Sequence, residues 1–124
     1  MRLALLIVSL LLTKHCLFDF VVQSRFQREN KGSYGHPGGL LHCLLHILGT
    51  LCAFLIIAPS LVGGTLILLA EFLTHYHVDW LKERLLRRTG WSFDDSAYWT
   101  VFGVDQLIHG LTYVVIAGAL ASGV

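Results

Sequence analysis

Four long apolar segments limit what this chain can fold into. Each is about 20 residues long, the length that crosses a hydrocarbon core of about 30 Å as a helix, and they cover residues 3–22, 40–58, 62–81 and 101–121. Only helices and closed barrels satisfy their backbone hydrogen bonds in lipid, and these runs are continuous rather than alternating. The sequence therefore predicts an all-α fold, an integral membrane four-helix bundle that occupies residues 1–124 as a single domain.

Composition argues against two other classes of protein. Charged residues are only 14% of the 124 residues, whereas they make up about a quarter of an average soluble domain. The formal net charge is +1, too small for the electrostatic attraction on which nucleic-acid binding depends. We therefore expect membrane lipid, and no nucleic acid, as a partner.

Lysine and arginine are distributed unevenly over the connecting segments. Segments 23–39 and 82–100 carry seven of them, and the opposite side of the predicted bundle carries only Arg2. Because basic residues accumulate on the cytoplasmic side, we expect these two segments in the cytoplasm and both termini outside. Residues at about 82–98 mix leucine, tryptophan and basic side chains, which predicts an amphipathic segment lying flat at the interface.

Histidine and aspartate form one pair on each predicted helix, always four residues apart. This spacing puts both side chains of a pair on one face of a helix. Random placement of the seven His and five Asp residues would give about one such pair. With the orientation taken from lysine and arginine alone, the pairs fall in the cytoplasmic third of the membrane: His15 and Asp19, His42 and His46, His75 and Asp79, Asp105 and His109.

Five histidines and three aspartates at one depth predict a metal site. Imidazole and carboxylate suit zinc, with manganese or iron as alternatives, and bundle cores build such sites from pairs on facing helices. Eight candidates exceed the needs of one tetrahedral ion, so both one and two divalent ions remain open. The competing interpretation is that these residues only hydrogen-bond between helices and hold the bundle together.

Three other polar residues continue the faces marked by the pairs. Lys82 is predicted to bind an anionic group such as phosphate, although it could instead extend to the lipid headgroups. Glu71 is a candidate general base or partner of a metal ligand, and Tyr113 is a candidate proton donor. Lys14 lies deep in the first span without an evident partner, and His77 points away from the paired face.

The order of these motifs resembles a family of small bacterial and phage membrane proteins, domain of unknown function 3307. The shared motifs are "HCLFDFVVQ", "LLHCLLH", "HYHVDWLK" and "DQLIH", which extend over nearly the whole chain. The resemblance implies a protein of the bacterial inner membrane and supplies no activity; the four apolar segments predict several passes, and the basic segments predict a site toward the cytoplasm. More distantly, the His-x-x-x-Asp pairs are similar to those of membrane-bound putative metal-dependent hydrolases and of zinc-dependent phospholipase C.

The distant similarity implies metal-dependent hydrolysis of a phosphoester in a lipid or lipid-linked substrate at the cytoplasmic leaflet. Transport of metal ions or protons is the main alternative, because intramembrane His and Asp also form relays. The outer halves of the spans are almost wholly apolar, which weighs against a path through the membrane. A non-catalytic phage or bacterial membrane-interaction protein, an oxidative di-iron enzyme and a homo-oligomer also stay open.

Overall fold

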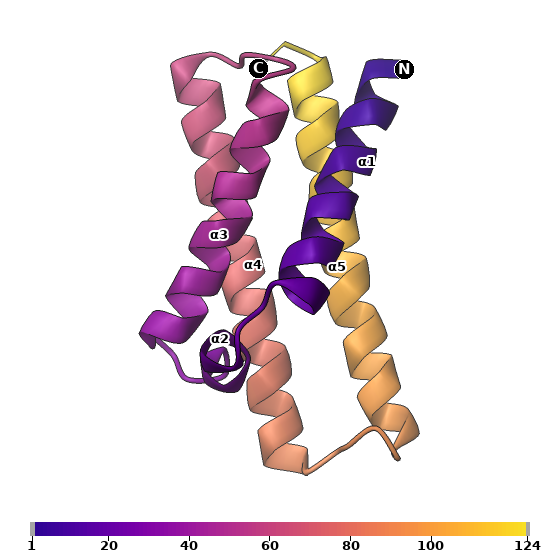
Figure 1. Ribbon diagram of the computed structural model, residues 1–124. Helices are drawn as coiled ribbons and strands as arrows, with labels where there is room; N and C mark the ends of the chain where they lie inside the picture. The colour runs from indigo at the N-terminus through magenta and orange to yellow at the C-terminus, as the bar shows by residue number, and fades with distance from the viewer. Residues whose placement is uncertain (1, 124) are drawn as a thin grey trace.

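The computed structural model describes residues 2–123, and most of them are helical (Figure 1). No strand occurs within this range. Among the described residues, four helical segments are long and apolar enough to cross a membrane, which confirms the all-α fold class and the prediction of four helices able to span. In chain order the elements are α1 (Arg2–Cys16), the π-helical segment η1 (Leu17–Val21), α2 (Arg25–Asn30), α3 (Pro37–Phe54), α4 (Leu61–Thr89) and α5 (Ser96–Ala121).

The four long helices form a ring in which neighbours pack side by side. α1 contacts α3 and α5, and α4 contacts the same two helices from the opposite corner. Both chain ends and the α3–α4 turn lie at one end of the bundle, whereas α2 and the α4–α5 turn lie toward the other (Figure 1). The two basic connecting segments are therefore at the same end. That this end faces the cytoplasm remains a prediction from the positive-inside rule.

The surface of the bundle is apolar and much of its interior is polar, the reverse of a soluble domain. Leu61 is 88% exposed and Val115 is 70% exposed, as expected for side chains that face lipid. In the part of the chain that the structure describes, the buried polar and charged residues are Lys14, His15, Gln27, Lys31, His42, His46, Thr50, Glu71, His75, Asp79, Asp105 and His109. This distribution fits a membrane, where ionisable groups face the interior of a helical bundle.

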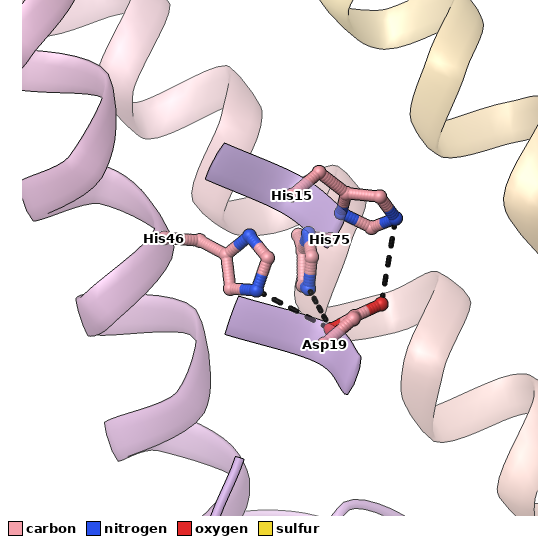
Figure 2. Close-up of side chains that lie close together, drawn as sticks. All are labelled: His15, Asp19, His46 and His75. Atoms are coloured by element: carbon pink, nitrogen blue, oxygen red, sulfur yellow. Dashed lines mark ion pairs between the residues drawn. The ribbon is translucent and has the colours of Figure 1, made fainter. Parts of the chain in front are cut away.

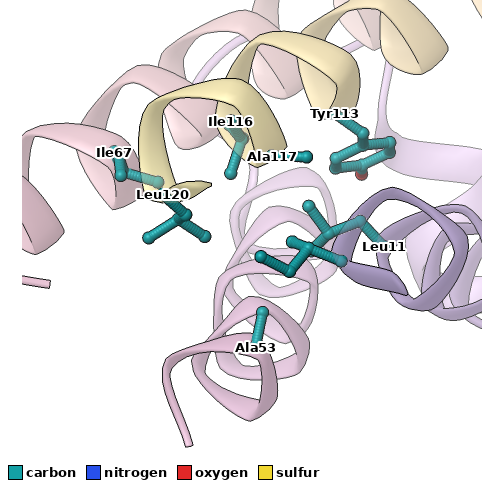
Figure 3. Packing of buried hydrophobic residues seen from close by; sticks show 8 residues of the cluster. Leu11, Ala53, Ile67, Tyr113, Ile116, Ala117 and Leu120 are labelled. Atoms are coloured by element: carbon teal, nitrogen blue, oxygen red, sulfur yellow. The ribbon is translucent and has the colours of Figure 1, made fainter. Parts of the chain in front are cut away.

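An apolar core fills the half of the bundle that is nearer the chain ends (Figure 3). It joins α1, α3, α4 and α5 through Ile7, Leu11, Ala53, Ile67, Tyr113, Ile116, Ala117 and Leu120. The buried histidines and aspartates come later on α1 and earlier on α5 than these residues, so they lie on the other side of the core. The interior is thus divided into an apolar layer and a polar layer, with Tyr113 at the boundary.

Local sequence signals set the ends of α3 and α4. His36 is the N-cap of α3 and accepts a hydrogen bond from the backbone N–H of Gly38. Pro37 follows in the first turn, where its missing N–H would have no helical partner in any case. Ser60 caps α4 with its hydroxyl. Gly90 is the C-cap of α4, and its φ of 72° lies in the left-handed region that glycine adopts without strain.

The predicted interfacial segment at about 82–98 does not form a separate element, so this prediction was wrong. α4 continues without a break to Thr89, a turn follows over residues 90–95, and α5 begins at Ser96. The residues of "KERLLRR" are strong helix formers, and the helix of the third span therefore extends past its apolar run. With 29 residues, α4 is about 43 Å long, longer than a hydrocarbon core of about 30 Å.

A short helix lies within the connecting segment 23–39, for which no helix was predicted. α2 begins with a capping box, in which Ser24 accepts from the backbone N–H of Gln27 and Gln27 accepts from that of Ser24. The Ser-x-x-Gln spacing is a recognisable signal for such a start. α2 packs closely on the start of α3. The approach is so close that a Cβ at Gly38 would lie 2.7 Å from the carbonyl oxygen of Phe26.

Gly38→Ala tests this close contact. The added methyl group would meet a backbone oxygen rather than a mobile side chain, so we expect a destabilisation of about 1–3 kcal/mol. Thermal unfolding of the purified protein in detergent measures it. Gly103→Ala is the matched control, because a Cβ there meets nothing within 4 Å, and it should leave the melting temperature unchanged or slightly raised. Equal melting temperatures for the two variants would contradict the contact.

Candidate metal centre

The structure brings the eight predicted ligands together in one cluster. The first span, α3, α4 and α5 supply two each, namely His15 and Asp19, His42 and His46, His75 and Asp79, Asp105 and His109. The Asp19 side chain is 4% exposed and the other seven residues are buried. The four pairs therefore meet at one level of the bundle, and because α4 and α5 are longer than predicted, this level is near their middle. The role of these residues as ligands stays a prediction.

The Asp19 carboxylate lies at the centre of the first part of the cluster (Figure 2). Its Oδ1 is 2.9 Å from His42 Nε2 and 3.3 Å from His46 Nε2, and its Oδ2 is 3.4 Å from His15 Nε2. His75 Nε2 lies 3.9 Å from the same Oδ1. Asp19 is carried by η1, and π-helical turns of this kind are frequent at functional sites. One carboxylate thus joins histidines from three helices.

Asp79, Asp105 and His109 form the second part of the cluster. Asp79 Oδ1, Asp105 Oδ1 and His109 Nε2 are buried and have no hydrogen-bond partner among the described residues. A buried polar atom without a partner is unfavourable. One ligand atom from each of the three residues lies within 4.8 Å of the other two. A cation held between them would satisfy all three side chains.

The cluster has enough ligands for two ions at once. Two groups of ligand atoms within 4.8 Å share no residue: one comprises His15, Asp19, His46 and His75, and the other Asp79, Asp105 and His109. A third group overlaps both and contains Asp19, His42, His75 and Asp79. The first group offers three imidazoles and one carboxylate, a donor set that suits zinc, whereas the second is richer in carboxylate.

Two of the histidines are oriented by a contact at the second ring nitrogen. His109 Nδ1 donates a hydrogen bond to the backbone carbonyl oxygen of Asp105 at 2.8 Å. The side-chain amide of Gln23 lies 3.1 Å from His42 Nδ1. In both cases Nε2 faces the cluster. Metal-ligating histidines are commonly held in this way, because the contact fixes the orientation of the ring.

Tyr113 supports two further rings from the boundary of the apolar core. Its hydroxyl oxygen is 3.4 Å from both His15 Nδ1 and His46 Nδ1. These nitrogens are the ones that do not face the Asp19 carboxylate. The contacts favour a positioning role for Tyr113, while its role as a proton donor to substrate stays a prediction.

Lys14 has a partner that was not recognised in the sequence. Its ammonium group forms a buried ion pair with the Glu71 carboxylate and donates to the backbone carbonyl oxygen of His46 at 2.7 Å. The ammonium nitrogen also lies 4.8 Å from the centre of the Tyr113 ring. Glu71 is therefore engaged by a cation next to the cluster. Through Lys14, Glu71 is thus connected to the backbone of α3, which favours a structural role for it. The role of Glu71 as a general base stays a prediction.

Two lysines border the aspartates on the side away from the apolar core. Lys31 Nζ lies 2.9 Å from Asp79 Oδ2 and 3.5 Å from Asp19 Oδ1. Lys82 Nζ lies 3.5 Å from Asp105 Oδ2 and 3.8 Å from Asp79 Oδ1. Each lysine thus contacts two of the three carboxylates and reduces the repulsion between them.

A pocket of about 240 Å³ opens beside both lysines. Arg28, Lys31 and Lys82 contribute three cations to its lining, against the carboxylates of Asp19 and Glu83. Because Asp19 belongs to the lining, the cluster can be reached from this pocket. A small anion that entered here would be next to both basic side chains and candidate ligands.

Sequence reasoning assigned no site role to Lys14, Lys31 or Arg28. Lys14 and Glu71 carried a usable signal, since they are the lysine and the glutamate inside the predicted spans and lie at similar depth. Lys31 and Arg28 carried none beyond their charge, because their positions depend on how α2 folds back on α3. The prediction that His77 lies off the site agrees with the structure, where it is exposed and its Nε2 lies 3.2 Å from the Tyr34 hydroxyl.

His75→Ala and Asp79→Ala test the ligand role. We expect purified wild-type protein to retain one or two divalent ions per chain and each variant to lose bound metal, because both residues belong to more than one overlapping ligand group. Elemental analysis by mass spectrometry measures the ratio of metal to protein, and circular dichroism confirms that the helices remain. His77→Ala is the matched control and should keep its metal. Wild-type protein without metal after loading would contradict the site.

Lys14→Met and Glu71→Gln test the buried ion pair. Removing one partner leaves a buried charge or an unpaired polar group, so we expect each single variant to lose about 3–5 kcal/mol of stability. The double variant should be less destabilised than the sum of the two, which a double-mutant cycle of unfolding free energies measures. Additive effects would show that the two side chains do not interact.

Residues 6–123 match the model of the family described as "Protein of unknown function (DUF3307)". No curated protein matches this chain, and no solved structure matches it. The similarity to metal-dependent hydrolases therefore rests on the His-x-x-x-Asp motifs alone. Because the family match extends over nearly the whole chain and includes all four paired motifs, the protein belongs to the DUF3307 family.

Proposed function

We propose that this protein is a membrane-embedded, metal-dependent hydrolase that acts on a phosphoester of a lipid or lipid-linked substrate. The observation that carries the proposal is the two-part His/Asp cluster next to a basic pocket. Phosphoester hydrolysis uses both features, since metal ions activate water and polarise the phosphoryl group while basic side chains hold the anion. Neither feature is needed if the polar residues only join helices.

The proposed metal is zinc in the group of His15, Asp19, His46 and His75, with manganese or iron as alternatives. Three imidazoles with one carboxylate match the ligands that zinc prefers. The carboxylate-rich group of Asp79, Asp105 and His109 would hold a second ion. In this proposal His42 lies between the two groups and Asp19 is the carboxylate accessible from the pocket.

The proposed task of Lys82 and Lys31 is to hold the phosphate. Both ammonium groups lie within 4 Å of aspartates of the cluster and both line the basic pocket. A phosphate placed there would replace the aspartates as the partner of these lysines. The aspartates would then bind the proposed metal ions. Gln106 lines the same pocket; its amide nitrogen donates to Asp105 Oδ2 at 2.9 Å and its Oε1 lies 3.2 Å from His15 Nε2, so it connects two of the candidate ligands.

The apolar core argues against the transport alternative. A proton or ion path would need polar groups through the whole membrane. Among residues 2–123, the buried polar residues nearest the chain-end face are Lys14, Thr50 and Glu71. Beyond them the interior is filled by apolar side chains, with Ile7 and Leu11 fully buried. This favours a site open at one end over a continuous path.

The proposed location is the bacterial inner membrane, with the basic pocket toward the cytoplasmic leaflet. Support comes from the seven basic residues of the two connecting segments at that end of the bundle. An anionic lipid headgroup on the cytoplasmic side would be drawn to the same charges. The pocket would thus lie on the same side of the membrane as the phosphate headgroup of the proposed substrate.

Hydrolysis by metal-loaded protein in lipid nanodiscs tests the proposal. We expect release of the aryl alcohol from a water-soluble diaryl phosphate and of inorganic phosphate from a long-chain alkyl phosphate, both abolished by a chelator and restored by zinc or manganese. Asp105→Asn should lower kcat by more than about a hundredfold, because even residues behind metal ligands are worth 10–100-fold. Asp94→Asn is the control, since Asp94 is exposed in the α4–α5 turn. Bound metal without turnover of any phosphoester would refute hydrolysis.

A further inference from the structure

A groove of about 210 Å³ lies between α4 and α5 on the outside of the bundle. Val78, Leu81 and Leu85 line it from α4, and Val104 and Ile108 line it from α5. Leu81 is 60% exposed and Val104 is 51% exposed, so the groove faces the surrounding lipid. Its lining also includes Lys82 and Asp105, whose side chains are 11% and 1% exposed and form its inner wall.

The groove is a neighbour of the basic pocket, because Lys82 lines both. Asp105 belongs to the groove and Asp19 to the pocket. The two candidate metal groups are therefore approached from two directions, one from lipid and one from the basic end. A molecule that occupied both spaces would have an apolar part in the groove and an anionic part beside Lys82.

We propose that the α4–α5 groove binds the apolar chain of a lipid phosphate, with the phosphate against Lys82 at the edge of the basic pocket. Such a ligand would enter sideways from the membrane rather than from water. This inference deepens the proposed function by saying how its substrate binds. It rests on that function only for the reaction, since binding requires no turnover.

The length of the groove fits the upper part of one hydrocarbon chain. The lining spans Val78 to Leu85 on α4 and Thr100 to Ile108 on α5, a length of about 10–12 Å along each helix. The upper part of one lipid chain can lie along this length, between the apolar side chains of the two helices.

A lysine in the lining distinguishes this groove from the other apolar hollows on the outside of the bundle. Three other apolar hollows face the outside of the bundle, one at the α3–α4 turn, one between α1 and α5, and one between α4 and α5 nearer the chain ends, and no lysine or arginine lines any of them. They would accept a lipid chain without regard to the headgroup. In the α4–α5 groove, Lys82 offers a cation that also contacts Asp79, Glu83 and Asp105, so an anionic headgroup would bind by taking over part of these contacts.

Photocrosslinking in nanodiscs tests the inference. The probe is an alkyl phosphate that carries a diazirine on its chain, at low abundance in phosphatidylcholine, and peptide mass spectrometry locates the label. We expect label on the groove residues of α4 and α5, reduced by excess dodecyl phosphate and not by dodecanol. Label spread evenly over the lipid-facing residues of all four helices, or displaced equally by both competitors, would overturn the inference.

Two pairs of variants sharpen the test. Leu81→Trp fills the groove, whereas Leu107→Trp places the same ring outside it at nearly equal exposure, since the leucines are 60% and 59% exposed. Lys82→Gln removes the cation, and Arg88→Gln removes an exposed one from the same helix. Groove labelling should be lost in Leu81→Trp, fall about fivefold in Lys82→Gln, and stay unchanged in both controls. Equal labelling of Leu81→Trp and Leu107→Trp would exclude the groove.

The outcome separates this inference from the proposed function. Groove labelling in protein that neither holds metal nor turns over phosphoesters would support lipid binding and reject the hydrolase. Hydrolysis of the water-soluble diaryl phosphate by protein whose groove is not labelled would support the hydrolase and reject the groove. Inorganic phosphate serves as a further competitor. If it displaced the probe as well as dodecyl phosphate does at the same concentration, the alkyl chain would contribute nothing to binding, and the inference would be overturned.

Discussion

Carboxylates buried inside a bundle that faces lipid must be matched by hydrogen-bond donors or positive charge, and the rest of the structure depends on this constraint. Asp19 is surrounded by histidines of three helices, and Lys31 and Lys82 contact the two carboxylate oxygens of Asp79. A buried charge that loses its partner is strongly destabilising. The packing of the helices and the position of α2, which precedes Lys31, are therefore needed to place the partners of the buried carboxylates.

The division of the interior into an apolar and a polar layer makes the two ends of the bundle different. The apolar core holds the helices together where the chain ends lie, and the polar layer opens toward the basic end. Lys14 and Glu71 form an ion pair at the boundary, so the charges nearest the apolar layer compensate each other. Chemistry at the polar layer is consequently reached from one end and from the side of the bundle, and not through it.

The His/Asp pairs show how much of the site could be read along the chain. A spacing of four residues fixes a common face on any helix, and span lengths in lipid fix the depth, so convergence followed from local rules. The extent of α4 was misjudged because hydropathy reports where a helix meets lipid and not where it ends. Lys31 was missed because its contacts with Asp79 and Asp19 depend on the fold of a connecting segment rather than on a periodic pattern.

The sequence alone therefore determined the number of spans, the end at which the basic residues gather and the eight polar residues that face the interior. These follow from the lipid environment, which leaves a helix few choices of length and orientation. Tertiary structure decided which ligands belong together, how the lysines are shared and where the pocket and groove lie. Those features arise from contacts between helices far apart in sequence, at distances of a few ångströms that no pattern along one helix can specify.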